Sequence, residues 1–258
     1  MRRKGTLVVA LLFALYGGVA TAQEDISAED DIFALKNFSG SVALTTDYVF
    51  RGLSQTDQDP AIQGSFDYSH PTGIYLGVWG SGVDEGVSEG NVEFDYYGGF
   101  TRELFEDFSY DVSFIYYHYP GGGSNPELDY YEVHLGLSYV FAFLPTEPAI
   151  AGGYNYSPDF FGEDDDAHYV NGTLDLSFPY GFGLGFEIGY QYVKGDETTG
   201  NNQGESGKDG FDYLHWRIGL SKELLGFGLD LSYHDTDDSG FLGNVADERV
   251  VFTVSRSF

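Results

Sequence analysis

The sequence predicts an all-β fold, a transmembrane antiparallel up-and-down β-barrel of about twelve strands. Three observations lead to this prediction: apolar and polar side chains alternate along most of the chain, a secretory leader precedes the alternation, and the chain ends on an aromatic residue, Phe258. In the last segment Val250, Phe252 and Val254 share one face while Arg249 belongs to the other. Such alternation is the signature of strands in outer-membrane barrels.

The first residues have the layout of an export signal. Arg2, Arg3 and Lys4 precede an apolar run from Leu7 to Tyr16, and a small-residue cleavage site ends at Ala22. A membrane-anchoring helix is the weaker alternative, because the run is shorter than the roughly 20 residues that cross a bilayer. We therefore expect a signal peptide that is removed on export.

The chain divides into three predicted parts. Residues 1–22 are the cleaved signal peptide, residues 23–38 form an acidic periplasmic N-terminal tail or a short helix, and residues 39–258 form the barrel. No later apolar stretch reaches helical spanning length without a charge, a glycine or a turn residue. A membrane protein with this sequence must cross with strands.

The composition excludes several classes of function. The formal net charge of −29 becomes −32 when the three basic residues of the leader are removed, so we expect no nucleic-acid partner. The chain has no Cys, which excludes disulfides and a thiolate nucleophile. Acidity can indicate disorder, but 21 Tyr and 22 Phe oppose that and require burial in protein or lipid.

Twelve segments alternate with period two, and most approach the 9 to 11 residues of a tilted transmembrane strand. The connections at 71–73 and 179–181 are tight, whereas those at 194–210 and 236–247 are long, as short periplasmic turns opposite longer outer loops would be. The predicted strands are Gly40 to Arg51, Ala61 to His70, Ile74 to Gly82, Asn91 to Thr101, Phe108 to Tyr119, Asp129 to Val140, Ala149 to Ser157, Ala167 to Phe178, Phe182 to Val193, Phe211 to Lys222, Phe227 to Asp235 and Glu248 to Phe258.

The two faces of these strands differ consistently. In the first strand, Val42, Leu44, Tyr48 and Phe50 share the apolar face, and later strands repeat the pattern. A soluble β-sandwich would also alternate, with its apolar face inward, so alternation alone does not separate the two folds. The leader, the aromatic residues at strand ends and the terminal Phe favour the membrane barrel.

One long motif resembles the TorF family of porins. It runs from Thr46 to Thr56 (TDYVFRGLSQT) and continues through 59–64 and 73–81, with weaker similarity at 117–121 and 129–139. The resemblance extends over nearly the whole mature chain. It implies a porin-like barrel in the outer membrane of a Gram-negative bacterium, but no particular solute.

The polar face is predicted to line a pore. Nine acids fall on this face against three arginines, and charged rings in a narrow passage bias which ions enter, so the excess favours cations or neutral solutes. The alternative is that acids and arginines pair across the lumen and close it. The predicted pore-lining residues are Asp47, Arg51, Glu93, Asp95, Asp111, Glu132, His134, Asp175, Glu187, Arg217, Asp230 and Arg249.

Asp47 and Arg51 are four residues apart on the first predicted strand and both face inward, which places them roughly 13 Å apart along it. They cannot pair with each other, so each needs a partner on another strand. Arg51 is then either a contact for solute or half of a structural ion-pair network, and the structural role is favoured because buried charges are rarely left unpaired.

An outer-membrane enzyme is the rival from another class. His134 with Ser138, or His215 and His234 with Asp230, are the conceivable catalytic sets. No Gly-x-Ser-x-Gly motif frames a serine, and the histidines lack metal-ligand spacing, so we predict no catalytic residues, no metal site and no cofactor. Residues 235–246 begin like a calcium loop but have Ala246 at position twelve, which argues against a calcium site.

The sequence as a whole predicts a porin-like channel in the outer membrane for passive diffusion of small hydrophilic solutes or ions. Its surroundings would be outer-membrane lipid and lipopolysaccharide, with which acidic outer loops such as 163–166 would either share divalent cations or simply be solvated. A closed-lumen barrel with a structural or surface-interaction role is the alternative.

Overall fold

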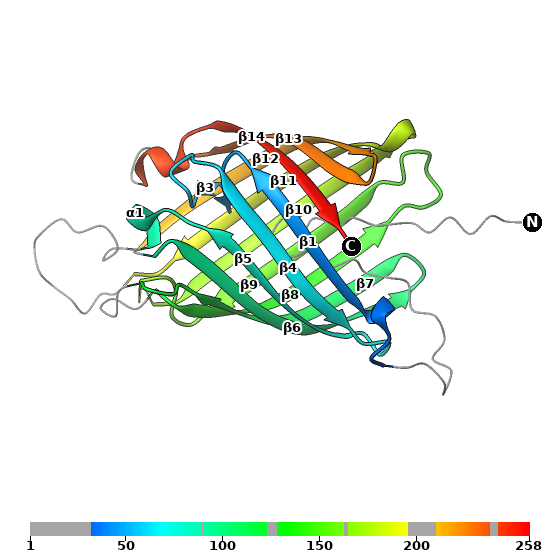
Figure 1. Cartoon of the computed structure of the whole chain (residues 1–258), viewed down its shortest axis with the longest axis horizontal. Coiled ribbons are helices and arrows are strands. Elements are labelled where there is room, and N and C mark those ends of the chain that lie inside the picture. Colours follow the sequence, from blue (N-terminus) through cyan, green and yellow to red (C-terminus); the bar gives the residue numbers. More distant parts are fainter. Residues whose placement is uncertain (1–31, 89, 123–127, 163–164, 196–209, 238–241) are drawn as a thin grey trace, which may run out of the picture.

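The computed structural model describes residues 32–88, 90–122, 128–162, 165–195, 210–237 and 242–258. Twelve strands form one closed antiparallel barrel, in which neighbours in sequence pair and the last strand closes on the first (Figure 1). The predicted barrel is therefore confirmed, and the single closed sheet excludes the two-sheet sandwich. The barrel strands are β1 (Phe38–Thr45), β4 (Ala61–Ser69), β5 (Ile74–Gly82), β6 (Val92–Phe105), β7 (Phe108–His118), β8 (Tyr130–Val140), β9 (Ala149–Ser157), β10 (Ala167–Phe178), β11 (Phe182–Val193), β12 (Phe211–Leu224), β13 (Phe227–Thr236) and β14 (Arg249–Ser257).

The remaining elements are short. Strands β2 (Val49–Phe50) and β3 (Leu53–Ser54) form a separate two-stranded sheet. The helical elements are η1 (Leu35–Asn37), α1 (Glu85–Ser88), η2 (Pro179–Gly181) and η3 (Gly243–Ala246). None of the helices in the described ranges has the length and apolar character of a membrane-spanning helix.

The two ends of the barrel differ. At one end, here the turn end, tight connections such as 70–73 and 225–226 join the strands, and the chain terminus is paired into the wall. There the backbone N–H and C=O of Phe258 exchange hydrogen bonds of 3.0 Å with Gly40. At the other end, the loop end, the connections are longer, as between β1 and β4 or β13 and β14. This is the predicted alternation of connection lengths.

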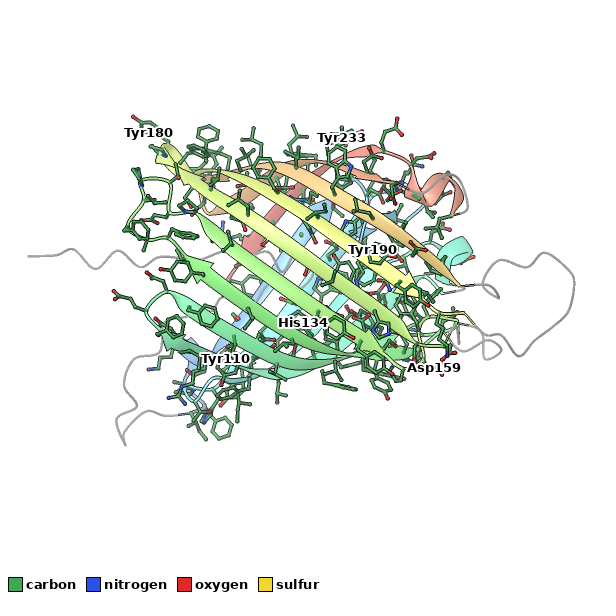
Figure 2. All side chains as sticks on the ribbon, turned by 180° about the vertical axis from the view of Figure 1, so that it is seen from behind. Tyr110, His134, Asp159, Tyr180, Tyr190 and Tyr233 are labelled. Carbon is green, nitrogen blue, oxygen red and sulfur yellow. The ribbon has the colours of Figure 1, made fainter. Side chains whose placement is uncertain are left out.

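The outer surface is apolar and the interior is polar. Leu44 is 57% exposed and Val250 64% exposed, whereas the inward Glu93 is 2% and Glu132 1% exposed. Figure 2 shows apolar and aromatic side chains projecting from the outside of the wall, among them Tyr190 and Tyr233. This distribution is the inverse of a water-soluble fold and matches a barrel surrounded by hydrocarbon.

The first predicted strand is wrong at its end. It was expected to run to Arg51, but β1 stops at Thr45 and the chain then leaves the wall. Tyr48, expected to face lipid, is only 2% exposed inside the barrel. The reason is that an alternating segment that folds into the lumen has the same period as one that stays in the wall, so periodicity does not separate the two.

The other predicted strand ends differ from the observed ones by at most four residues, the largest difference being at the end of β6. The predicted signal peptide and residues 23–31 of the predicted tail lie outside the described residues. The described part of the tail forms η1 at the turn end, where the Asn37 side-chain amide donates to the carbonyl of Ile32 at 2.9 Å.

Candidate functional site

The lumen has two halves with different contents. In the half toward the loop end, here the loop half, Glu93, Glu132 and Gln191 are at most 2% exposed. In the half toward the turn end, here the turn half, the side chains of Asp175 and Glu187 are only partly buried. The loop half is therefore filled by protein, and these two side chains of the turn half are less tightly enclosed.

The loop half is filled by the segment between β1 and β4. After Thr45 the chain turns inward, and β2 pairs with β3 through Val49 with Ser54 and Phe50 with Leu53. The two turn residues, Arg51 at φ 48° and Gly52 at φ 85°, both have positive φ, which is the requirement of the type I′ hairpin turn. We call residues 46–60 the lumen hairpin.

The base of the lumen hairpin is held by Asp47. Its carboxylate accepts hydrogen bonds from the hydroxyls of Ser54 at 2.7 Å and Thr56 at 2.8 Å, and from the guanidinium of Arg249 on β14 at 3.1 Å. The hydroxyl of Thr56 also accepts from the backbone N–H of Tyr48 at 3.1 Å. The ion pair attaches the hairpin to the wall beside the strand that it leaves.

The tip of the lumen hairpin reaches the opposite wall. Arg51 donates to both carboxylate oxygens of Glu132 on β8, at 2.8 and 2.6 Å, and to the side-chain oxygen of Gln191 on β11 at 2.9 Å. Its guanidinium carbon lies 4.1 Å from the ring centroid of Tyr169 on β10 and 4.6 Å from that of Phe50. A bidentate carboxylate and an aromatic face are the preferred surroundings of arginine.

The wall side of this contact, here the guanidinium cradle, consists of Glu132, Gln191 and Tyr169. Its members are held by other wall residues. Glu132 Oε2 also accepts from the hydroxyl of Tyr117 at 3.1 Å and from the amide of Asn155 at 2.9 Å, and Tyr169 hydrogen-bonds to His215 Nε2 at 2.9 Å.

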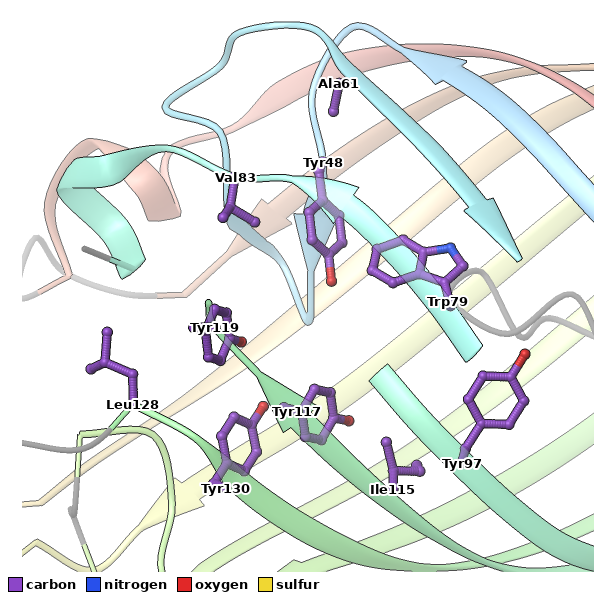
Figure 3. Packing of buried hydrophobic residues seen from close by; sticks show 10 residues of the cluster. All are labelled: Tyr48, Ala61, Trp79, Val83, Tyr97, Ile115, Tyr117, Tyr119, Leu128 and Tyr130. Atoms are coloured by element: carbon purple, nitrogen blue, oxygen red, sulfur yellow. The ribbon is translucent and has the colours of Figure 1, made fainter. Parts of the chain in front are cut away.

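Aromatic side chains fill the space between the hairpin and β5–β8. Figure 3 shows Tyr48 pointing from the hairpin into a cluster with Trp79, Tyr117, Tyr119 and Tyr130. The Tyr48 ring packs edge-on against Trp79, with ring centroids 5.2 Å apart, and its hydroxyl donates to Glu93 at 3.2 Å. This packing holds the hairpin from a second side, so the hairpin narrows the loop half.

The turn half is lined by acids with small or hydroxyl-bearing neighbours. Arg217 and Asp230 form a 2.6 Å ion pair whose side chains are 11% and 29% exposed. Asp111 accepts from the Tyr75 hydroxyl at 2.9 Å. Asp175 lies on the same wall, and its Oδ2 has no hydrogen-bond partner among the described residues. Unlike Glu132 in the loop half, Asp111, Asp175 and Glu187 in the turn half form no ion pair with Arg or Lys among the described residues.

All twelve predicted residues lie inside the barrel, but Asp47 and Arg51 come from the lumen hairpin and not from the wall. Each of the three arginines pairs with a carboxylate: Arg51 with Glu132, Arg217 with Asp230, and Arg249 with Asp47. The expectation that Asp47 and Arg51 have partners on other strands is confirmed. In the described part of the chain, the lumen acids that form no ion pair with Arg or Lys include Asp67, Glu93, Asp111, Asp175 and Glu187.

The three histidines of the conceivable catalytic sets each hydrogen-bond to a different neighbour. His134 contacts Asn155 at 3.0 Å, His215 contacts Tyr169, and His234 contacts Ser232 at 3.0 Å. Among the described residues no three His, Asp or Glu side chains are grouped as metal ligands. Residues 238–241 of the calcium-like segment, and residues 163–164 of an acidic loop, lie outside the described residues.

Four contributors to the site were missed as candidates from the sequence: Tyr117, Tyr169, Asn155 and Gln191. Strand alternation could have predicted that these side chains face inward, because residues two apart on a strand share a face. Tyr117 is two residues from the inward Ile115, and Tyr169 is two from Asn171. The contact of Tyr169 with Arg51 follows only from the folded hairpin.

The chain belongs to a family described as a bacterial protein of unknown function (Gcw_chp), whose model matches residues 33–258. No protein of curated function matches the sequence. The barrel fold that the resemblance implies agrees with the solved structures below, whereas membership of the TorF family stays a prediction.

Solved structures of outer-membrane channels share the fold at low sequence identity. A KdgM porin matches with a TM-score of 0.55 and 12% identity, over 85% of this chain and 98% of that one. A NanC porin matches with a TM-score of 0.52 and 10% identity, over 84% and 97%. A COG4313 outer membrane channel from Pseudomonas putida F1 matches with a TM-score of 0.50 and 13% identity, over 86% and 95%.

Proposed function

We propose that this Gcw_chp barrel is an outer-membrane channel for passive diffusion of small hydrophilic solutes, with a preference for cations and neutral solutes over anions. The loop end faces the outside and the turn end faces the periplasm, because outer-membrane barrels have short periplasmic turns and longer outer loops. On this proposal the lumen hairpin is the constriction, the turn half is a water-filled vestibule, and the barrel is a transporter and not an enzyme.

The observation that supports this proposal is the charge of the vestibule. Asp111, Asp175 and Glu187 line the turn half with no Arg or Lys ion-pair partner among the described residues, and Arg217 beside them is already paired with Asp230. Fixed carboxylates in a confined space attract cations and repel anions.

The solute of a structural neighbour does not transfer to this chain. One matching structure is a KdgM porin in complex with disordered oligogalacturonate, a polyanion. Here each of the lumen arginines that were predicted to line the pore is already bound by a carboxylate. A polyanion would find none of these three arginines free for pairing, so we expect a different class of solute.

The closed-lumen alternative draws support from the lumen hairpin, whose two ion pairs and aromatic cluster fill the loop half. Planar-bilayer recordings separate the two. A channel passes a steady single-channel current with a cation-selective reversal potential, whereas a permanently closed barrel passes none.

The selectivity test uses Asp175→Asn with Glu187→Gln. Removing both charges is expected to move the reversal potential in a salt gradient toward the unselective value, because fixed lumen charge sets the ion ratio. Glu106→Gln is the control for loss of an acid outside the lumen, since Glu106 lies in an exposed turn. Unchanged selectivity in the double variant would contradict the role of the vestibule acids.

A further inference from the structure

We infer that the guanidinium cradle is a solute-binding site for guanidinium-bearing cations, and that Arg51 occupies it as an internal stand-in which such a solute displaces. The inference rests on the proposed function, because it treats the lumen as a path for solutes. It names the class of solute that the constriction recognises.

The cradle is matched to a guanidinium group on every side. Glu132 offers two oxygens in line with the two terminal nitrogens, Gln191 accepts a third hydrogen bond, and the Tyr169 ring covers the planar face at 4.1 Å. An ammonium group can neither form the two parallel bonds nor stack in this way. The site therefore selects a planar, delocalised cation.

The hydrogen bonds that orient the cradle come from the wall, while the hairpin adds one ring contact, Phe50 on Tyr117 with centroids 5.9 Å apart. Tyr117 and Asn155 donate to Glu132, and His215 fixes Tyr169, through contacts that do not involve the hairpin. Gly189 leaves the space that this arrangement needs, because a Cβ there would lie 2.4 Å from His215 Nε2 and 2.5 Å from the Tyr169 hydroxyl. A cradle held from outside keeps its shape when Arg51 leaves, and such pre-organisation favours binding.

Arg51, the occupant of the cradle, has in contrast an unfavourable backbone conformation. Arg51 has a left-handed backbone at φ 48°, which is unfavourable for a residue with a long side chain. The hairpin that presents it has only two paired residues in each strand, and short hairpins are marginally stable alone. The strain in the backbone and the fit of the side chain together indicate that the position of Arg51 is retained for its contact with the cradle.

Charge explains why displacement must be an exchange. Glu132 is 1% exposed, so withdrawal of Arg51 without replacement would leave a buried, unpaired carboxylate. A solute that brings its own guanidinium restores the pair and removes this penalty. Opening of the hairpin is thereby coupled to binding of the solute that passes.

The binding test uses Arg51→Ala, which empties the cradle, with L-arginine as the probe. L-Lysine and the neutral isostere L-citrulline are the comparison ligands. We expect Arg51→Ala to bind L-arginine at least about tenfold more tightly than L-citrulline and L-lysine, because only arginine supplies a charged planar fork. We expect at least about a tenfold loss of that affinity in Arg51→Ala with Glu132→Gln.

Gln191→Leu in the Arg51→Ala background is the second variant, which tests the cradle if the Glu132 variant does not fold; a severalfold weaker binding of arginine is expected. Affinity for arginine that equals affinity for citrulline, or that survives loss of Glu132 or Gln191, overturns the site.

Displacement is read from Trp79, which packs on Tyr48 of the hairpin. The chain has two tryptophans, so Trp216→Phe leaves Trp79 as the sole reporter. With Arg51 in place, L-arginine is expected to change Trp79 emission while L-citrulline does not. Arginine that saturates Arg51→Ala but never changes Trp79 emission in the presence of Arg51 overturns the displacement.

Failure of the channel proposal has a different readout. A barrel that binds arginine in the cradle but carries no current in any variant retains the site and loses the channel. A barrel that conducts but binds arginine no better than citrulline retains the channel and loses the site.

Discussion

The loop half and the turn half of the lumen are lined by the same strands and by similar side-chain types, yet they differ in water access. The Arg51–Glu132 pair in the loop half is 6% and 1% exposed, whereas the Arg217–Asp230 pair in the turn half is 11% and 29% exposed. One inserted segment accounts for the difference, because residues 46–60 fill only the loop half. If the proposed function is correct, the loop half constricts the lumen and the acids of the turn half bias it toward cations.

The largest expected effect comes from removing the segment that makes the halves different. Replacing residues 48–54 with a short glycine linker should raise single-channel conductance by about tenfold or more, since a barrel of this strand number is wide enough for a passage once it is unfilled. Planar-bilayer recording measures it. An unchanged conductance would mean that the turn half, and not the hairpin, restricts the lumen.

The two ion pairs should differ in their contribution to stability. Glu132→Gln leaves a buried arginine without its counter-charge and should lower the free energy of unfolding by about 3–5 kcal/mol. Asp230→Asn breaks a more exposed pair, and we expect a loss of about 1 kcal/mol or less. Urea titration in lipid vesicles compares them. Equal losses would contradict the difference in water access.

A smaller loss of stability is expected when a methyl group is added beside the cradle. Gly189→Ala places a Cβ 2.4 Å from His215 Nε2 and should cost about 1–3 kcal/mol through overpacking. Gly172→Ala is the matched control on the neighbouring strand, where the nearest atom to a Cβ is 3.9 Å away. The same titration measures both variants, and a Gly189 variant as stable as the Gly172 variant would show that the wall at the cradle is not tightly packed.

The smallest effect concerns selectivity in the loop half. Glu93 lies under the hairpin and hydrogen-bonds to Tyr48, so Glu93→Gln should leave the reversal potential unchanged while the hairpin is present. In the hairpin-shortened barrel the same substitution should reduce cation selectivity slightly, because the carboxylate then faces the passage. A shift in the intact barrel would show that ions already reach Glu93.

Most of the wall could be predicted from the sequence. The strands from β4 to β14 follow from their alternation and their turn residues, and the inward position of Glu93, Glu132 and Arg217 follows from the same period. The candidate site could be predicted only in part. Tyr48 and Phe50 continue the alternation beyond Thr45, so the pattern that identified the wall also concealed the inserted hairpin.

The sequence by itself determined the barrel, its apolar outside and the acidic excess inside, because these depend on local period and on composition. Only the tertiary structure decided which acids meet an arginine and which face water. Arg51 and Glu132 are 81 residues apart, and their contact depends on barrel closure and on a hairpin that crosses the lumen. A local pattern specifies which face a side chain occupies, but a partner across a closed barrel is set by the strand register and by the path of the inserted chain.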